Sequence, residues 1–303
     1  MTREEREKNM AVKSMTGFGR GEAVEGALKV VVELSTVNRK QFDCSVSLPR
    51  ELTSLDSKVQ ALVHARVARG YVKGVVTVTA AEQAGAAGAL DLVRLTTQLG
   101  AVRAAAQALG LADDLTASSL LRLPDLLRPC VLPDDPLDVW PLMERAVQAA
   151  LEKLDAMRLR EGGALERDLR ARFAALETLS REIAALAPAV PAAYKAVLER
   201  RLADLLGAGQ LADPALVARE VAVFADRCDV SEELTRLASH FAQVTKVFDA
   251  GGACGRTLDF LCQELFREIN TTGSKANDAA ISRRVIDFKA GLEAAREQVQ
   301  NIE

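Results

Sequence analysis

The sequence predicts an α+β protein in which a mostly antiparallel α/β region precedes a long, predominantly helical region. Before about residue 80, apolar and polar residues alternate, which is the period of a half-buried strand. From about residue 92, apolar residues recur at spacings of three and four, the period of an amphipathic helix. We therefore divide the chain into four parts: a disordered extension at 1–11, an α+β domain at 12–155, connecting long helices at 156–215 and a C-terminal helical domain at 216–303.

The α+β domain contains three clear strand signals. The segments 28–34 and 42–48 alternate in polarity, and the segment 71–80 is rich in valine and threonine, which favour strands. Gly26 stands at a hairpin position before the first of them. Apolar residues at helical spacing predict a helix at 52–68. Strands interrupted by one helix indicate an α+β unit with mostly antiparallel pairing.

Helices are predicted for most of the remaining chain. A linker of small residues at 84–89 precedes a helix at 92–106, and a proline-rich loop at 124–136 follows it. Helical spacing then continues from Trp140 to Leu186 and from Tyr194 to Leu205.

The segment 226–249 is predicted to be a helix with an apolar face and a polar line beside it. Its apolar residues keep helical spacing from Val230 to Phe248, and Ser231 is in place to cap the N-terminus. The polar line consists of Asp229, Glu233, Arg236 and His240.

The segment 256–275 has a matching polar line. Glu264 and Glu268 are four residues apart, so both carboxylates project from one side of a helix, with Arg267 between them. The glycine-rich break at 251–255 allows the two helices to run antiparallel and to bring their polar lines together. The alternative is a pair of amphipathic helices whose charges only face water.

The last predicted helix carries the most regular pattern. Apolar residues from Ile281 to Ile302 alternate spacings of four and three, the 3.5-residue repeat of a coiled-coil seam. This seam can pack against the 230–249 helix of the same chain or against a second chain.

Composition narrows the possible chemistry. No apolar run approaches the roughly 20 residues of a membrane span, and the first ten residues lack the core of a secretory signal, so we expect a cytoplasmic protein without membrane association. Five scattered cysteines without a CxxC pair favour reduced thiols over a zinc site. No phosphate-binding glycine loop or nucleophile elbow occurs. Carboxylates are therefore the main source of chemistry, and His240 is the better general acid or base of the two histidines.

Separate motifs at both ends resemble the YicC-type endoribonucleases. SMTGFGRGE at 14–22 and VELSTVNRKQFD at 32–43 resemble the N-terminal domain of that family. DVSEELTRLASHF at 229–241, GRTLDFLCQELFREINTTGSKAND at 255–278 and the terminal AAREQVQNIE resemble its C-terminal domain. The alanine- and leucine-rich middle shows little resemblance beyond its helices.

The resemblance implies a metal-dependent endoribonuclease that cleaves single-stranded RNA, and it suggests a homo-oligomer, specifically a hexamer. Carboxylates that hold Mg²⁺ or Mn²⁺ can neutralise a phosphodiester and position the attacking group. The predicted catalytic residues are Glu264, Glu268, His240 and Glu233, and the predicted metal ligands are Glu264, Glu268 and Asp229. The sequence alone does not show which carboxylates bind the metal.

Basic residues are expected to contact the RNA backbone. The predicted RNA-binding residues are Arg39, Lys40, Arg69, Lys73, Arg267, Asn270 and Lys275. The family usually has arginine where this chain has Lys40, and lysine keeps the charge but loses bidentate geometry. A net charge of −3 argues against a nucleic-acid coat protein but not against an enzyme with a local basic lining. The alternatives are a non-catalytic oligomeric RNA-binding or scaffold protein, and a protein that binds only other proteins.

Overall fold

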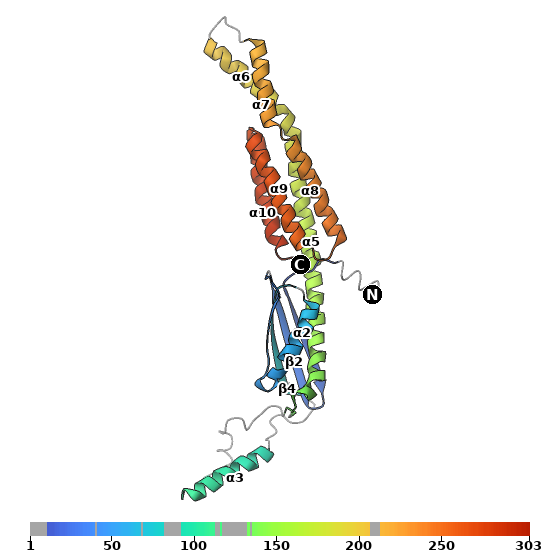
Figure 1. Ribbon diagram of the computed structural model, residues 1–303, viewed down its shortest axis with the longest axis vertical. Helices are drawn as coiled ribbons and strands as arrows, with labels where there is room; N and C mark the ends of the chain where they lie inside the picture. Colours follow the sequence, from blue (N-terminus) through green and yellow to red (C-terminus); the bar gives the residue numbers. More distant parts are fainter. Residues whose placement is uncertain are drawn as a thin grey trace. The chain divides into compact units, whose positions relative to one another are not determined.

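The computed structural model describes residues 11–39, 41–67, 69–81, 92–112, 116, 132–133, 135–206 and 213–303 (Figure 1). All but residue 11 of the expected N-terminal extension, the 84–89 linker and most of the proline-rich loop lie outside these residues. The chain divides into two units. The first is Thr16–Met157, and the second contains Arg158–Glu303 together with residues 11–15.

The first unit is built on a four-stranded sheet with the order β1-β2-β4-β3. Its first two pairings are antiparallel and β3–β4 is parallel, which confirms the α+β prediction with mostly antiparallel pairing. The parallel pair requires a crossover connection, and a short 3₁₀ helix followed by α2 provides it where one continuous helix was predicted. The bounds are β1 (Gly17–Glu25), β2 (Leu28–Val37), β3 (Asp43–Ser47), η1 (Arg50–Leu55), α2 (Asp56–Arg66) and β4 (Tyr71–Ala80).

One face of this sheet is buried against α2 and the first part of α5 (Trp140–Leu186) (Figure 1). The alternation of β2 places Val30, Val32 and Leu34 in this core. Glycine in β1 lets α5 approach the strand closely. A Cβ on Gly21 would lie 2.0 Å from the carbonyl oxygen of Ala146. At that distance the strand or the helix would have to shift, so only glycine fits here without strain.

The described part of the remaining chain is helical, as predicted. The elements are α3 (Leu92–Ala108), η3 (Pro136–Val139), α5 with η4 (Ala187–Ala189) after it, α6 (Val190–Leu206), α7 (Pro214–Cys228), α8 (Ser231–Ala250), α9 (Gly255–Lys275) and α10 (Ala279–Val299). Among these described helices, none has both the length and the apolar character that crossing a membrane demands.

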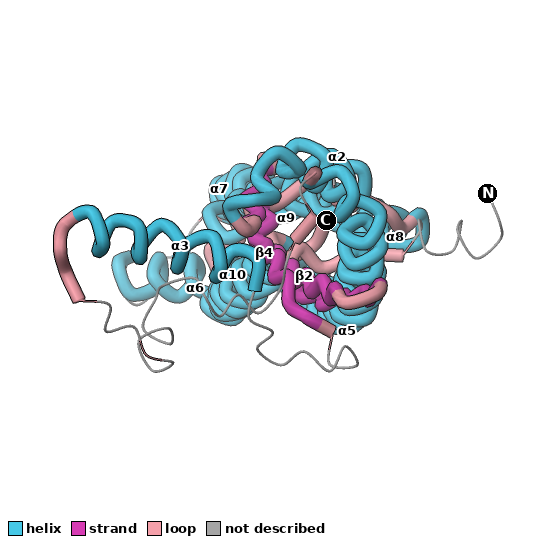
Figure 2. Tube along the Cα trace, turned by 90° about the horizontal axis from the view of Figure 1, so that it is seen from below, coloured by secondary structure: helices cyan, strands magenta, loops and turns pink. Residues whose placement is uncertain are grey.

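The core of the second unit lies among the later part of α5, α8, α9 and α10, which run side by side (Figures 1 and 2). The seam of α10 is buried here: Ile281, Phe288 and Leu292 are each at most 2% exposed. Phe288 meets Phe241 of α8 with ring centroids 6.2 Å apart. The 3.5-residue repeat is therefore satisfied within the chain, the first of the two alternatives that its pattern allowed.

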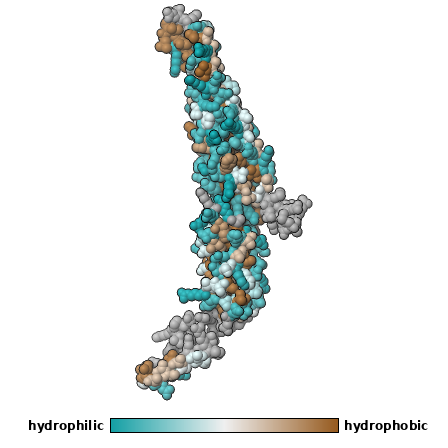
Figure 3. All heavy atoms as spheres, viewed as in Figure 1, coloured by the Kyte–Doolittle hydropathy of each residue, from teal (hydrophilic) through white to brown (hydrophobic). Residues whose placement is uncertain are grey.

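The α6–α7 pair carries apolar side chains on its surface. Tyr194 of α6 stacks on Phe224 of α7 at 3.7 Å between ring centroids. Further along the pair, Leu205 and Leu216 are 82% and 65% exposed. Figure 3 shows apolar side chains gathered at this end of the hairpin. Leucines of both helices line a groove of about 760 Å³ between them.

Candidate active site on helices α8 and α9

Helices α8 and α9 form an antiparallel hairpin. A side-chain hydrogen bond stabilises the start of α8, and two glycines form the turn between the helices. At the start of α8, the Asp229 carboxylate accepts a hydrogen bond from the Ser231 amide at 2.9 Å. The predicted cap at Ser231 is therefore wrong: Ser231 is the first residue of α8, Val230 occupies the N-cap position, and the side-chain acceptor is Asp229. At the turn, Gly251 and Gly252 have φ values of 65° and 75°, a region that glycine enters without a steric penalty.

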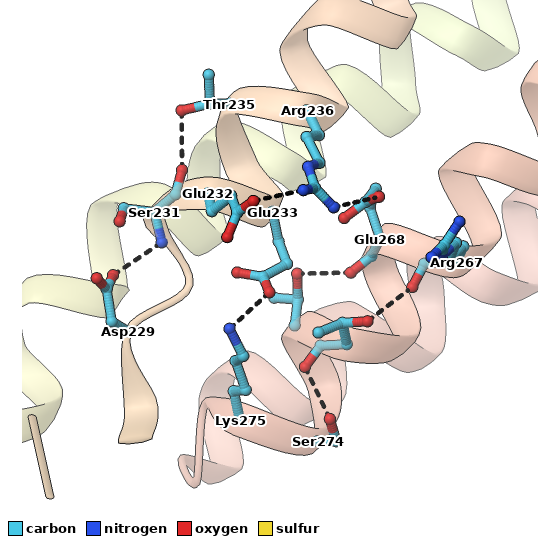
Figure 4. Close-up of polar contacts among 12 residues, drawn as sticks. Asp229, Ser231, Glu232, Glu233, Thr235, Arg236, Arg267, Glu268, Ser274 and Lys275 are labelled. Atoms are coloured by element: carbon cyan, nitrogen blue, oxygen red, sulfur yellow. Dashed lines mark hydrogen bonds and ion pairs between the residues drawn. The ribbon is translucent and has the colours of Figure 1, made fainter. Parts of the chain in front are cut away.

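The hairpin brings the two polar lines together, and ion pairs join them (Figure 4). Lys275 Nζ lies 2.7 Å from Glu233 Oε1. One turn further along, Arg236 Nη1 lies 3.5 Å from Glu268 Oε1, and the same guanidinium also contacts Glu232. Glu233 and Glu268 are only 5% and 4% exposed, so each carboxylate is shielded from water and has a cation from the facing helix as its neighbour.

His240, Glu264 and Glu268 form the centre of the site. Each contributes one possible ligand atom, and these atoms lie within 4.8 Å of one another. Glu268 is buried, and the other two residues are half-buried. Nδ1 of His240 is buried without a hydrogen-bond partner among the described residues. Buried polar atoms are nearly always satisfied, so this nitrogen is available to a proton or an ion.

The donor set fits a divalent cation. Two carboxylates suit Mg²⁺ and Mn²⁺, and an imidazole beside them favours a transition metal over Mg²⁺. Glu264 and Glu268 are the two predicted ligands that the structure places in this group. The third predicted ligand, Asp229, is not part of the group, because its carboxylate is engaged at the start of α8.

The remaining predicted residues of α9 line the same hairpin. Arg267 is exposed and forms no ion pair with another described residue. Asn270 is half-buried. A hydrogen bond to Glu233 raises the pKa of Lys275, which keeps this lysine protonated.

Thiol chemistry is disfavoured on these helices. Burial raises the pKa of Cys262 on α9 to about 12 and that of Cys254, just before it, to about 11. A neutral thiol is a poor nucleophile and a poor metal ligand. The reactive groups of the hairpin are therefore its carboxylates and its histidine.

The predicted RNA-binding residues of the first unit gather near the start of β4. Arg39 pairs with Asp43, and its guanidinium lies 5.5 Å from the centre of the Tyr71 ring. Lys73 is exposed on β4, and Arg69 precedes the strand with its Nε buried and unbonded within the described chain. Lys40 lies outside the described residues.

Comparison with known proteins places the chain in a family. Residues 12–167 match the model of the endoribonuclease YicC-like N-terminal region, and residues 183–303 match that of the C-terminal domain. The chain belongs to the YicC-like endoribonuclease family. A relative named "Probable endoribonuclease YicC" from Clostridioides difficile is 33% identical over 290 residues, which cover 96% of this chain and 99% of the relative. One of the same name from Haemophilus influenzae is 30% identical over 294 residues, with the same two coverages.

Sequence reasoning missed how this YicC-like chain pairs its charges. Arg236 was placed on the polar line but received no role, although it contacts Glu268 directly. The signal was its position, one turn after Glu233 and one turn before His240. A basic residue between two candidate acid–base residues on one edge indicates a partner for a carboxylate on the facing helix.

Proposed function

We propose that this chain is a metal-dependent endoribonuclease that cleaves single-stranded RNA at the α8–α9 hairpin. The observation that carries the proposal is the group of His240, Glu264 and Glu268, with its unbonded imidazole nitrogen. The chain's membership of a family described as endoribonucleases supports RNA as the substrate.

Each residue of the site has a defined part in this proposal. Glu264 and Glu268 hold the ion, either Mg²⁺ or Mn²⁺. When bound, a divalent cation neutralises charge on the phosphodiester and lowers the pKa of a coordinated water. His240 exchanges a proton at an imidazole nitrogen as the general acid or base of the reaction. Arg236 fixes the Glu268 carboxylate from the facing helix, and the Glu233–Lys275 pair holds the helices in register.

The variant Glu264→Gln tests the assignment. An amide keeps the shape of the side chain but loses the charge that a cation requires, so cleavage of an end-labelled single-stranded RNA should fall by roughly 100-fold or more. Half-buried Glu264 lacks a described ion pair, so folding should be retained. The matched control is Glu297→Gln, an exposed glutamate of the neighbouring helix α10.

A second measurement reports on the ion without relying on activity. Mn²⁺ that binds only the folded state raises the melting temperature, and the rise grows with the Mn²⁺ concentration relative to its Kd. The parent and Glu297→Gln should show this shift, and Glu264→Gln should lose it. Cleavage that continues in EDTA, or in the double variant of Glu264→Gln and Glu268→Gln, contradicts the proposal. RNA binding without fragments in any metal supports the non-catalytic RNA-binding protein instead.

We further propose that the chain forms a homo-oligomer in the cytoplasm, with a hexamer as the expected assembly. The apolar groove of α6 and α7 supports self-association, because exposed leucines gain from burial against a second copy. Free thiols at Cys228, Cys254 and Cys262 support a reducing compartment. Sedimentation of Leu216→Asp should show a smaller species with unchanged helix content; an unchanged mass places the interface elsewhere.

A further inference from the structure

The sheet of the first unit has a second face that its helices leave exposed. Residues of β1 alternate, so Gly19 and Gly21 face α5 while Phe18 and Arg20 point the other way. The register continues this face across the sheet. One row runs Phe18–Ser35–Lys73–Ser45 and the next runs Arg20–Glu33–Val75–Ser47. The Ser45 and Ser47 hydroxyls and the Lys73 ammonium are groups that hydrogen-bond phosphate and ribose oxygens, whereas the Ser35 hydroxyl already donates to the Lys73 carbonyl oxygen.

The charges of this face leave a positive excess. All three of its carboxylates are held by cations: Glu33 by Arg20, Glu22 by Lys29 and Asp43 by Arg39. Lys73 lies in the row that begins with Phe18, and no described carboxylate pairs with it. Such a face attracts an anion although the chain as a whole carries a net charge of −3.

Two aromatic rings lie on the same face. Phe18 is 48% exposed on the edge strand β1. Tyr71 is half-buried on β4, two strands away, and carries the Arg39 guanidinium 5.5 Å from its ring centre. Two strand spacings of about 4.8 Å and an offset of two residues along β4 separate the two residues by roughly 12 Å, so each ring can take a base of its own. Lys73 is directly across from Ser35 in the Phe18 row.

We propose that this face of the sheet binds single-stranded RNA, with bases stacked on Phe18 and Tyr71 and the intervening phosphate held by Lys73. The inference rests on the proposed action on RNA and adds a binding surface outside the α8–α9 hairpin. Stacking on a four-stranded sheet needs flat exposed rings and a cation for the backbone, and it tolerates any base sequence. A second protein copy is the less favoured occupant, because ion-paired charges and hydroxyls separate the apolar side chains of this face.

The experiment measures affinity by fluorescence anisotropy in EDTA, where cleavage is suppressed. The probes are a labelled uridine dodecamer and an abasic ribose-phosphate oligomer of equal length. Phe18→Leu keeps an apolar side chain but removes the ring, and should weaken binding of the uridine oligomer about 10-fold, since one stacked base is worth about 1–3 kcal/mol. Its affinity for the abasic oligomer should not change. The matched control is Val102→Ala, which trims an exposed side chain of α3, outside this face.

The outcomes separate this inference from the proposed function. Binding that depends on Phe18 without any cleavage supports the surface and contradicts the nuclease assignment. Cleavage with parental affinity in the folded double variant of Phe18→Leu and Tyr71→Leu overturns the surface alone. A fall in sedimentation mass with unchanged RNA affinity assigns the face to a second copy and also overturns it. An equal loss of affinity for the uridine and abasic oligomers shows that the rings do not stack on bases, and it also overturns the proposed surface.

Discussion

Each buried carboxylate on the α8–α9 edge faces a cation from the other helix. Glu233 on α8 meets Lys275 on α9, and Glu268 on α9 meets Arg236 on α8. Removing the cation leaves a buried carboxylate without a partner, which costs more than the ion pair itself contributes. These pairs therefore hold the hairpin in the one register that places His240 beside both site glutamates.

The Lys275–Glu233 pair gives stability a pH dependence that can be isolated with Lys275→Met. Hydrogen bonding to Glu233 raises the pKa of Lys275 above its ordinary value of 10.5. The contribution of the pair is complete below 10.5 and is lost as the pH rises through the higher, folded-state pKa. Lys275→Met should be less stable than the parent at neutral pH, and the difference in urea midpoint should shrink above pH 10.5. Lys275→Arg, which keeps the charge, is the control; a difference that grows with pH contradicts the assignment.

The residues of this edge were predictable from sequence, but their partners were not. Helical spacing identified Glu233, Arg236 and His240 as one line and Glu264 with Glu268 as another. The axial offset between two antiparallel helices depends on the length of the turn and on the packing of the core, which periodicity does not contain. For the same reason periodicity did not show that Asp229 lies at the start of α8, outside the group of His240, Glu264 and Glu268.

At the scale of elements, the strongest sequence signals gave the most accurate predictions. The alternation in β2 and the seam of α10 correspond to buried residues almost one for one. The parallel β3–β4 pair was not foreseen, because alternation specifies which face of a strand is buried but not its neighbour. The exposed ring of Phe18 was not predicted either, because the sequence does not show which side chains of an edge strand remain uncovered.

Helix α10 has a cap that makes a direct stability prediction. Both Ala280 and Ile281 donate their backbone N–H groups to Asp278 Oδ1, at 2.8 and 2.9 Å. Asp278→Ala leaves these donors without a side-chain acceptor and should lower the free energy of unfolding by about 1 kcal/mol. Asp278→Asn retains the acceptor and should lie close to the parent. Equal losses in the two variants in urea titrations would mean that the charge, rather than the cap, stabilises the helix.

At the scale of the molecule, the chain contains two separate hydrophobic cores. One lies between the sheet, α2 and the first part of α5, and the other lies among the later part of α5, α8, α9 and α10. The sole tryptophan, Trp140, packs against the first core, with Lys58 5.2 Å from its ring centre. Its fluorescence therefore reports on the first unit, while helical circular dichroism is dominated by the second.

One variant in each core tests whether the two units unfold independently. Leu292→Asp places an unpaired charge at a position 2% exposed and should cost several kcal/mol in the second unit. It should move the circular dichroism transition to lower urea and leave the Trp140 midpoint unchanged. Gly21→Ala forces a methyl group against the α5 backbone and should do the reverse, at a cost of about 1–3 kcal/mol. Ile286→Asp, at an exposed site of α10, is the control and should change neither signal. If both signals shift together in both variants, α5, which supplies residues to both cores, couples them into a single cooperative transition.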